Sequence, residues 1–126
     1  AVVITAVMED ATGYGRIVRD ENGNLLRIVE HRDASGREKE IKEINSGMYV
    51  FSSKELAETI ELLSNDNNQG EYYLTDLIEI MISKGYSVGT YKAEASDEVL
   101  GVNDPAQLKE VSAVLKKRTS REHSSL

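Results

Sequence analysis

The chain has 126 residues and a mass of 14.0 kDa, which is the size of a single domain. Hydrophobic residues make up 40% of it and charged residues 29%, as in an ordinary globular protein. Fifteen basic residues stand against twenty-two acidic ones, so the net charge is −7. A general nucleic-acid binder or a basic membrane-surface protein needs positive charge to meet phosphate, and the sequence therefore disfavours both classes.

Cysteine is absent, which excludes disulfide scaffolds, thiolate zinc sites and cysteine nucleophiles. The two histidines, His31 and His123, lie far apart, and neither stands in a pattern with metal-ligand spacing. No apolar run approaches the roughly 20 residues that span a bilayer. The apolar start, Ala1 to Met8, lacks the basic leader and cleavage pattern of a signal peptide. We therefore expect a soluble, cytoplasmic domain with neither nucleic acid nor membrane as a partner.

The first third of the chain predicts strands. Residues 2–8 form an apolar run, which is typical of a strand buried on both faces and covered by helices. Residues 16–19 and 25–31 flank Asn22-Gly23, a pair that favours a hairpin with a type I′ turn. Residues 33–42 are polar, as in a solvated loop or short exposed helix. Residues 44–51 predict a further strand, in which Gly47 marks a bulge or a close approach to the backbone.

Three helices and one more strand follow. Ser52 and Glu55 have the spacing of a capping box at the start of the first helix. The second helix is expected at 76–84, with Gly85 as its cap. A strand is expected at 86–92.

The third helix is expected at 104–118, with Asp104 as N-cap and Pro105 at its first position. Its apolar residues Leu108, Val111 and Leu115 are expected to face inward. A frayed tail at 119–126 would follow. The pattern predicts one α/β domain with a mixed sheet and flanking helices, without the strand, glycine-rich turn and helix that usually open a doubly wound fold.

Several short stretches could carry chemistry. Gly13-Tyr14-Gly15-Arg16 is either a simple turn or a place where Gly15 lets a ligand approach the backbone. Glu30 is either an exposed glutamate or a carboxylate that accepts hydrogen bonds from sugar hydroxyls. Residues 64–76 are rich in amides, carboxylates and tyrosine, which suits a helix cap and turn or a wall for a hydroxyl-rich ligand. Asn103 could lend a carbonyl oxygen to Mg²⁺.

At these stretches the sequence resembles a known family, the uridyltransferase (pyrophosphorylase) domain of the bacterial bifunctional N-acetylglucosamine-1-phosphate uridyltransferase/glucosamine-1-phosphate N-acetyltransferases. Five blocks occur in the family's order over nearly the whole chain. They are Thr12-Gly13-Tyr14-Gly15-Arg16-Ile17, Ile28-Val29-Glu30-His31, Glu43-Ile44-Asn45-Ser46-Gly47, Gln69-Gly70-Glu71-Tyr72-Tyr73-Leu74-Thr75-Asp76 and Glu98-Val99-Leu100-Gly101-Val102-Asn103.

The resemblance implies a Rossmann-like nucleotidyltransferase fold that converts UTP and N-acetylglucosamine 1-phosphate into UDP-N-acetylglucosamine and pyrophosphate, for cell-envelope precursors. Mg²⁺ would bridge the phosphates. The implied sugar-side residues are Gly15, Glu30, Asn45, Tyr73 and Thr75, and Asn103 would be the metal ligand. No residue of this chain is expected to react covalently, because the chemistry is mainly positioning and charge stabilisation.

The resemblance also indicates which parts of the family's enzyme this sequence does not match. The family's triphosphate loop, the residues that bind uracil and the acetyl-transferring β-helix domain have no counterpart in this sequence. The chain would then be the second, sugar-binding half of the uridyltransferase domain, spanning residues 1–118, and inactive alone. An apolar sheet face left in water costs about 25 cal/mol per Å². We therefore expect a complementing N-terminal half or self-association, and a homotrimeric parent enzyme.

Two alternatives stay open. One is a related sugar nucleotidyltransferase with a different sugar or nucleotide, since the residues that select the base would lie elsewhere. The other is a non-catalytic module that binds a sugar nucleotide.

Overall fold

A computed structural model of the chain describes residues 1–102 and 105–123. Five strands form one mixed sheet in the order β3-β2-β4-β1-β5. The strands are β1 (Val2–Val7), β2 (Arg16–Arg19), β3 (Leu25–Val29), β4 (Glu43–Val50) and β5 (Gly89–Lys92). The helices are α1 (Gly36–Lys39), α2 (Ser53–Thr59), η1 (Ile60–Leu62), α3 (Asp76–Ser83), η2 (Ser96–Glu98) and α4 (Pro105–His123). The predicted α/β class with a mixed sheet is confirmed, and no β-helix occurs among the described residues.

The sheet is mostly antiparallel. β1 runs antiparallel to β4 and parallel to β5, and β2 runs antiparallel to both β3 and β4. The predicted hairpin at β2–β3 is therefore present. Its turn differs from the expected type I′, because only Gly23 has a positive φ, of 85°. The Asp20 carboxylate instead accepts hydrogen bonds from the backbone of Asn22 and Asn24, which holds the turn together.

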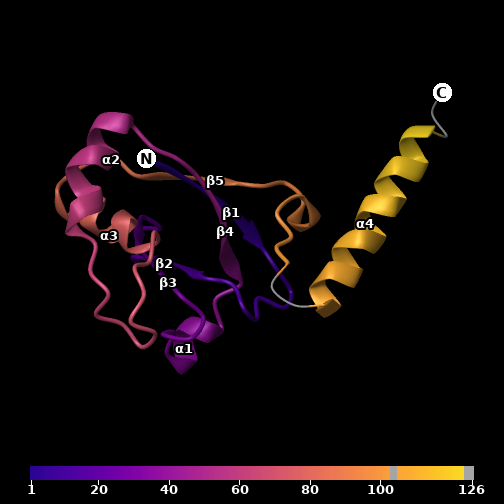
Figure 1. The fold of residues 1–126 in the computed structure, drawn as a ribbon, viewed down its shortest axis with the longest axis horizontal. Helices are drawn as coiled ribbons and strands as arrows, with labels where there is room; N and C mark the ends of the chain where they lie inside the picture. Colours follow the sequence, from indigo (N-terminus) through magenta and orange to yellow (C-terminus); the bar gives the residue numbers. More distant parts are fainter. Residues whose placement is uncertain (103–104, 124–126) are drawn as a thin grey trace.

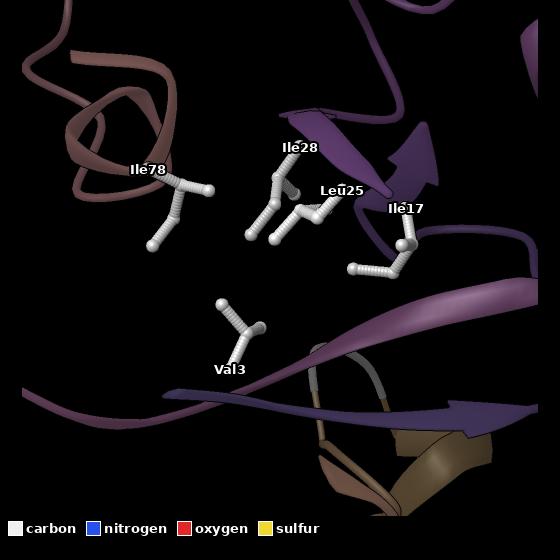
Figure 2. Close-up of a cluster of buried hydrophobic side chains, with 5 residues drawn as sticks. All are labelled: Val3, Ile17, Leu25, Ile28 and Ile78. Carbon is white, nitrogen blue, oxygen red and sulfur yellow. The ribbon is translucent and has the colours of Figure 1, made fainter. Parts of the chain in front are cut away.

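Each face of the sheet carries its own apolar cluster, because successive residues of a strand point to opposite faces. One face holds Val3, Ile17, Leu25 and Ile28, and α3 covers it with Ile78 (Figure 2). The opposite face holds a second cluster under the segment that includes η2. Its buried members are Ala6, Ala11, Ile44, Ala93 and Val99.

β1 is not buried along its whole length, contrary to the expectation. Val3, Thr5 and Ala6 are fully buried, whereas Val2 and Val7 are exposed at its two ends. The strand lies between β4 and β5, and its exposed ends are on different faces, because Val2 points to the same face as Ala6 and Val7 to the same face as Val3.

The first predicted helix is present as α2, but its capping box is not formed. Ser52 is the N-cap and makes no side-chain hydrogen bond there. A complete capping box instead joins Ser35 and Glu38 at α1. α3 follows the prediction and is followed by Gly85, whose φ is 79°.

The last helix corrects two expectations. α4 continues to His123, beyond Arg118, and Figure 1 shows it standing away from the sheet. Leu108 and Leu115 do not face a core, since they are 55% and 60% exposed. The expected cap Asp104 and the expected metal ligand Asn103 lie outside the described residues. None of the helices in the described part of the chain is long and apolar enough to cross a membrane.

Candidate functional site

Three neighbouring strands place Glu30, Gly15 and Asn45 in one row across the α3 face of the sheet. The register pairs Arg16 with both Val29 and Ile44, so the position before Arg16 faces Glu30 on one side and Asn45 on the other. The backbone N–H of Asn45 donates to the backbone carbonyl of Gly15 over 2.9 Å, as this register requires. Residues that the sequence separates by up to thirty positions are thus direct neighbours.

Glycine in the middle of this row leaves space between two polar side chains. A Cβ at Gly15 would lie 3.6 Å from Glu30 Oε2, 3.6 Å from Asn45 Cβ and 3.3 Å from Ile28 Cγ2. Any larger side chain would therefore fill the gap between the carboxylate and the amide. The predicted close approach of a ligand to the Gly15 backbone fits this geometry.

Thr75 connects this row to the start of α3. It is the N-cap position of that helix, is only 4% exposed, and donates its hydroxyl to Glu30 Oε1 over 3.0 Å. One carboxylate oxygen is thereby held in place, while the Oε2 atom lies beside the space over Gly15. The helix entrance and the end of β3 together orient Glu30.

Tyr73 lies in the same region of the structure as Glu30. Tyr73 and Glu30 line one hollow of about 520 Å³, beside the loop that precedes α3. Gln69 donates a 2.8 Å hydrogen bond from Nε2 to the Tyr73 hydroxyl, and Arg32 donates to Gln69 Oε1. Burial is the main reason why the pKa of Tyr73 is raised above its usual value.

The hollow is strongly acidic. Its lining carries five carboxylates, and its one basic side chain, Arg27, is paired with Glu38 of α1. The five are Glu30, Asp33, Asp66, Asp76 and Glu79. Burial, followed by the charges of Glu79 and Asp33, raises the pKa of Asp76. Such a lining accepts hydrogen bonds from hydroxyl groups and repels phosphates, so a ligand with both would place its hydroxyl-bearing part here.

Sequence reasoning missed two side chains of this region. Tyr49 lies next to Asn45, whose Nδ2 donates to the Tyr49 hydroxyl over 2.6 Å. Asp33 fixes the loop before α3 by accepting from the Asn68 amide over 3.3 Å. Both residues stand within the matching part of the chain, but their spacing carries no signal of these contacts.

Arg16, from the same motif as Gly15, lies on the opposite face of the sheet. Its side chain is buried and donates to the Tyr14 carbonyl, while Nη2 lies 3.5 Å from His31 Nδ1. Burial lowers the pKa of this guanidinium, and the charge of Asp10 partly opposes the effect. Arg16 therefore stabilises the backbone around Tyr14 and does not lie beside Glu30, Gly15 and Asn45.

The described residues do not form a metal centre. Among them there is no group of three or more histidine, aspartate or glutamate side chains that could hold an ion. The predicted ligand Asn103 is outside the described residues, so its role stays a prediction.

The fold and the row define an α/β protein whose mixed sheet carries polar residues beside an acidic hollow. Comparison with known proteins shows to which family this α/β protein belongs. The sequence model of the family described as nucleotidyl transferase matches residues 1–99, and the chain belongs to this family.

Individual relatives within this family are similar to the chain over almost its whole length. The chain is 52% identical over 123 residues to the bifunctional protein GlmU of Acetivibrio thermocellus and 50% identical over 123 residues to that of a Geobacillus strain. It is 50% identical over 121 residues to the bifunctional protein GlmU of Bacillus licheniformis. These matches cover 96–98% of this chain but only 26–27% of the relatives.

The chain thus spans about a quarter of the length of the curated relatives it matches. The family expected from the sequence motifs is confirmed. The expected position in the second half of the uridyltransferase domain is not supported by these matches, which show the family and the shared length alone.

Proposed function

We propose that this chain provides the sugar-binding side of a nucleotidyltransferase that makes UDP-N-acetylglucosamine and pyrophosphate from UTP and N-acetylglucosamine 1-phosphate. The observation that carries the proposal is the row of Glu30, Gly15 and Asn45 beneath Thr75. It combines a fixed carboxylate, an open backbone position and an amide on one surface. The GlmU relatives, which match the chain almost from end to end, support the choice of reaction.

Each residue would have a limited task. Glu30 would accept hydrogen bonds from sugar hydroxyls, because Thr75 holds one of its oxygens and leaves the other beside Gly15. Gly15 would offer its backbone where a side chain would collide. Asn45 would bond the sugar, and Tyr73 would supply a flat wall with a polar tip. The residues would position the sugar phosphate for attack on the α-phosphorus of UTP, which is a catalytic contribution through orientation.

The remaining parts of the reaction belong to the same proposal. The divalent metal, Mg²⁺ in this proposal, does not find a complete ligand set among the described residues, and Asn103 would be one ligand among others. Binding of the triphosphate would require groups beyond the row, since its acidic surroundings disfavour phosphate. The chain alone is accordingly expected to be inactive. A cytoplasmic location, self-association of the chain and a homotrimeric longer protein are further expectations of the same proposal.

The test uses the longer polypeptide that contains this chain, assayed for pyrophosphate release from UTP and N-acetylglucosamine 1-phosphate with Mg²⁺. Glu30→Gln should lower kcat/KM roughly 10- to 100-fold, because hydrogen bonds to a charged group contribute about 1.5–3 kcal/mol. Glu21→Gln, an exposed position in the hairpin turn, is the matched control.

Three results would redirect the proposal. Turnover with a different sugar phosphate or nucleotide would favour a related nucleotidyltransferase. Binding of UDP-N-acetylglucosamine without turnover would favour a non-catalytic module. Equal activity of Glu30→Gln and Glu21→Gln would remove Glu30 from the site.

A further inference from the structure

A bulge in β4 brings the Tyr49 hydroxyl into contact with the side chain of Asn45. β1 pairs Val3 with Tyr49 and Thr5 with Asn45, so two steps along β1 correspond to four steps along β4. In a regular strand, residues four apart are separated by roughly 13 Å. Here the bulge at 46–48 lets Asn45 Nδ2 and the Tyr49 hydroxyl approach to 2.6 Å. We propose that Tyr49 is a positioning residue of the sugar site, which fixes the side-chain amide of Asn45.

The bulge is itself held by specific hydrogen bonds. Gly47 has a φ of 81°, which a residue with a side chain rarely adopts. The Ser46 hydroxyl donates to the Ile4 carbonyl over 2.8 Å and accepts from the Met48 amide over 3.2 Å. The bulge is therefore anchored to β1 and is not a loose loop.

The Gly47 backbone decides which way the Asn45 amide faces, and Tyr49 then holds the other end of the amide. The backbone N–H of Gly47 can only donate, and its partner at 3.1 Å is Asn45 Oδ1. The NH₂ group then has to face Tyr49, whose hydroxyl accepts from it. Donor and acceptor ends of the amide are thus both assigned. Rotating the amide by 180° would break the hydrogen bond from Gly47 and force the Tyr49 hydroxyl to donate where it now accepts. A sugar bound next to Asn45 would therefore face an amide whose donor and acceptor atoms have fixed positions.

Tyr49 is well suited to this task. Its ring packs against the cluster on the α3 face and stacks on Phe51 with a centroid separation of 5.4 Å. Burial, with an added contribution from the Glu30 charge, raises the pKa of Tyr49 to about 12, so its hydroxyl keeps its proton at neutral pH. A rigid, neutral hydroxyl is an anchor that does not change with pH in the physiological range.

Because the role of Asn45 toward a sugar comes from the proposed function, the kinetic part of this inference rests on it. The direct readout is spectroscopic and needs no ligand. In the 126-residue chain, Tyr49→Phe should shift the side-chain amide signals of Asn45 in an ¹⁵N–¹H spectrum and speed their hydrogen exchange. Tyr91→Phe, which removes the hydroxyl of an exposed tyrosine on the opposite face, should leave them unchanged.

The kinetic readout uses the longer, active polypeptide. Tyr49→Phe should raise KM for N-acetylglucosamine 1-phosphate roughly threefold to tenfold, the range of one net hydrogen bond, with kcat and KM for UTP nearly unchanged. Tyr91→Phe should match the wild type in all three. A merely structural role would instead lower the folded fraction, which changes apparent kcat and leaves both KM values unchanged.

The outcomes separate the inference from the function on which it rests. An inactive wild-type polypeptide overturns the proposed function, and the Asn45 signals still test the anchor. An active wild type whose Tyr49→Phe variant behaves like Tyr91→Phe overturns the positioning role. Unchanged Asn45 amide signals in Tyr49→Phe overturn the anchor itself.

Discussion

The Thr75 hydroxyl donates a 3.0 Å hydrogen bond to Glu30 Oε1, which joins the entrance of α3 to the end of β3. This contact bridges 45 positions of sequence and fixes the carboxylate that the proposed function depends on. Glu30 directly follows the last residue of β3, and Thr75 directly precedes the first residue of α3. The site is therefore coupled to how α3 docks on the sheet.

Thr75→Val tests this contact with little change of shape. The valine keeps the volume but leaves the Glu30 oxygen without its donor, so we expect the free energy of unfolding to fall by about 1 kcal/mol. Urea unfolding of the 126-residue chain measures it. Thr75→Ser keeps the hydroxyl and should lose clearly less. Equal losses in both variants would show that the methyl group, and not the hydrogen bond, matters.

Gly15→Ala tests the open position in the row. Because the new Cβ would lie 3.3 Å from Ile28 Cγ2, the isoleucine has to move by a few tenths of an ångström, which costs about 1 kcal/mol. Ligand affinity should suffer more than stability, since the methyl group occupies the space between Glu30 and Asn45. Calorimetric titration of the longer polypeptide with UDP-N-acetylglucosamine should show at least a tenfold weaker Kd, about 1.4 kcal/mol.

The matched control for that substitution is Gly89→Ala in β5, where a Cβ would meet nothing within 4 Å. It should leave affinity unchanged. If Gly15→Ala binds as tightly as the control, no ligand lies over Gly15.

Sequence patterns predicted the strands and helices well because these depend on local periodicity. In the hairpin, the sequence pattern predicted the position of the turn but not its type. Asn22-Gly23 marked the position of the turn, but its type depends on the Asp20 carboxylate, which binds the backbone on the far side of the turn. The capping box shows the same limit, since it forms at Ser35 and Glu38 and not at Ser52.

The site residues were predicted in a different way. Family resemblance supplied Gly15, Glu30, Asn45 and Thr75. Strand register explains why the first three are neighbours, and the position of α3 on the sheet brings Thr75 to Glu30. Tyr49 was missed because its contact with Asn45 depends on the two extra residues of the bulge. The alternation of side chains along a regular strand places residues four apart on one face, but about 13 Å from each other.

Gly47→Ala tests the bulge. An alanine at a φ of 81° is strained by about 1–2 kcal/mol, although open space surrounds the position. We therefore expect a loss of that size in urea unfolding. Gly36→Ala, also in open space but without a positive φ, should be neutral or slightly stabilising. A neutral Gly47→Ala variant would mean that the bulge does not need glycine.

Glu43 forms an ion pair with Arg19 that should make the stability of the chain depend on pH. Arg19 donates from Nε and Nη2 to the two Glu43 oxygens over 2.8 and 2.7 Å, and Thr5 adds a third hydrogen bond of 2.8 Å. The hydrogen bonds from Arg19 are the main cause that lowers the pKa of Glu43, and burial opposes them.

A lowered pKa means that the folded chain binds the proton of Glu43 less readily than the unfolded chain. The stabilisation is then complete above the ordinary value of 4.5 and is lost as pH falls through the folded-state pKa. Glu43→Gln should therefore cost about 1.5 kcal/mol at pH 7, as for a hydrogen bond to a charged group, and progressively less below 4.5. Urea unfolding from pH 7 to pH 3 measures the difference, with Glu21→Gln as an exposed control. A gap between the variant and the wild type that stays constant down to the lowest pH would show that charge does not contribute to this contact.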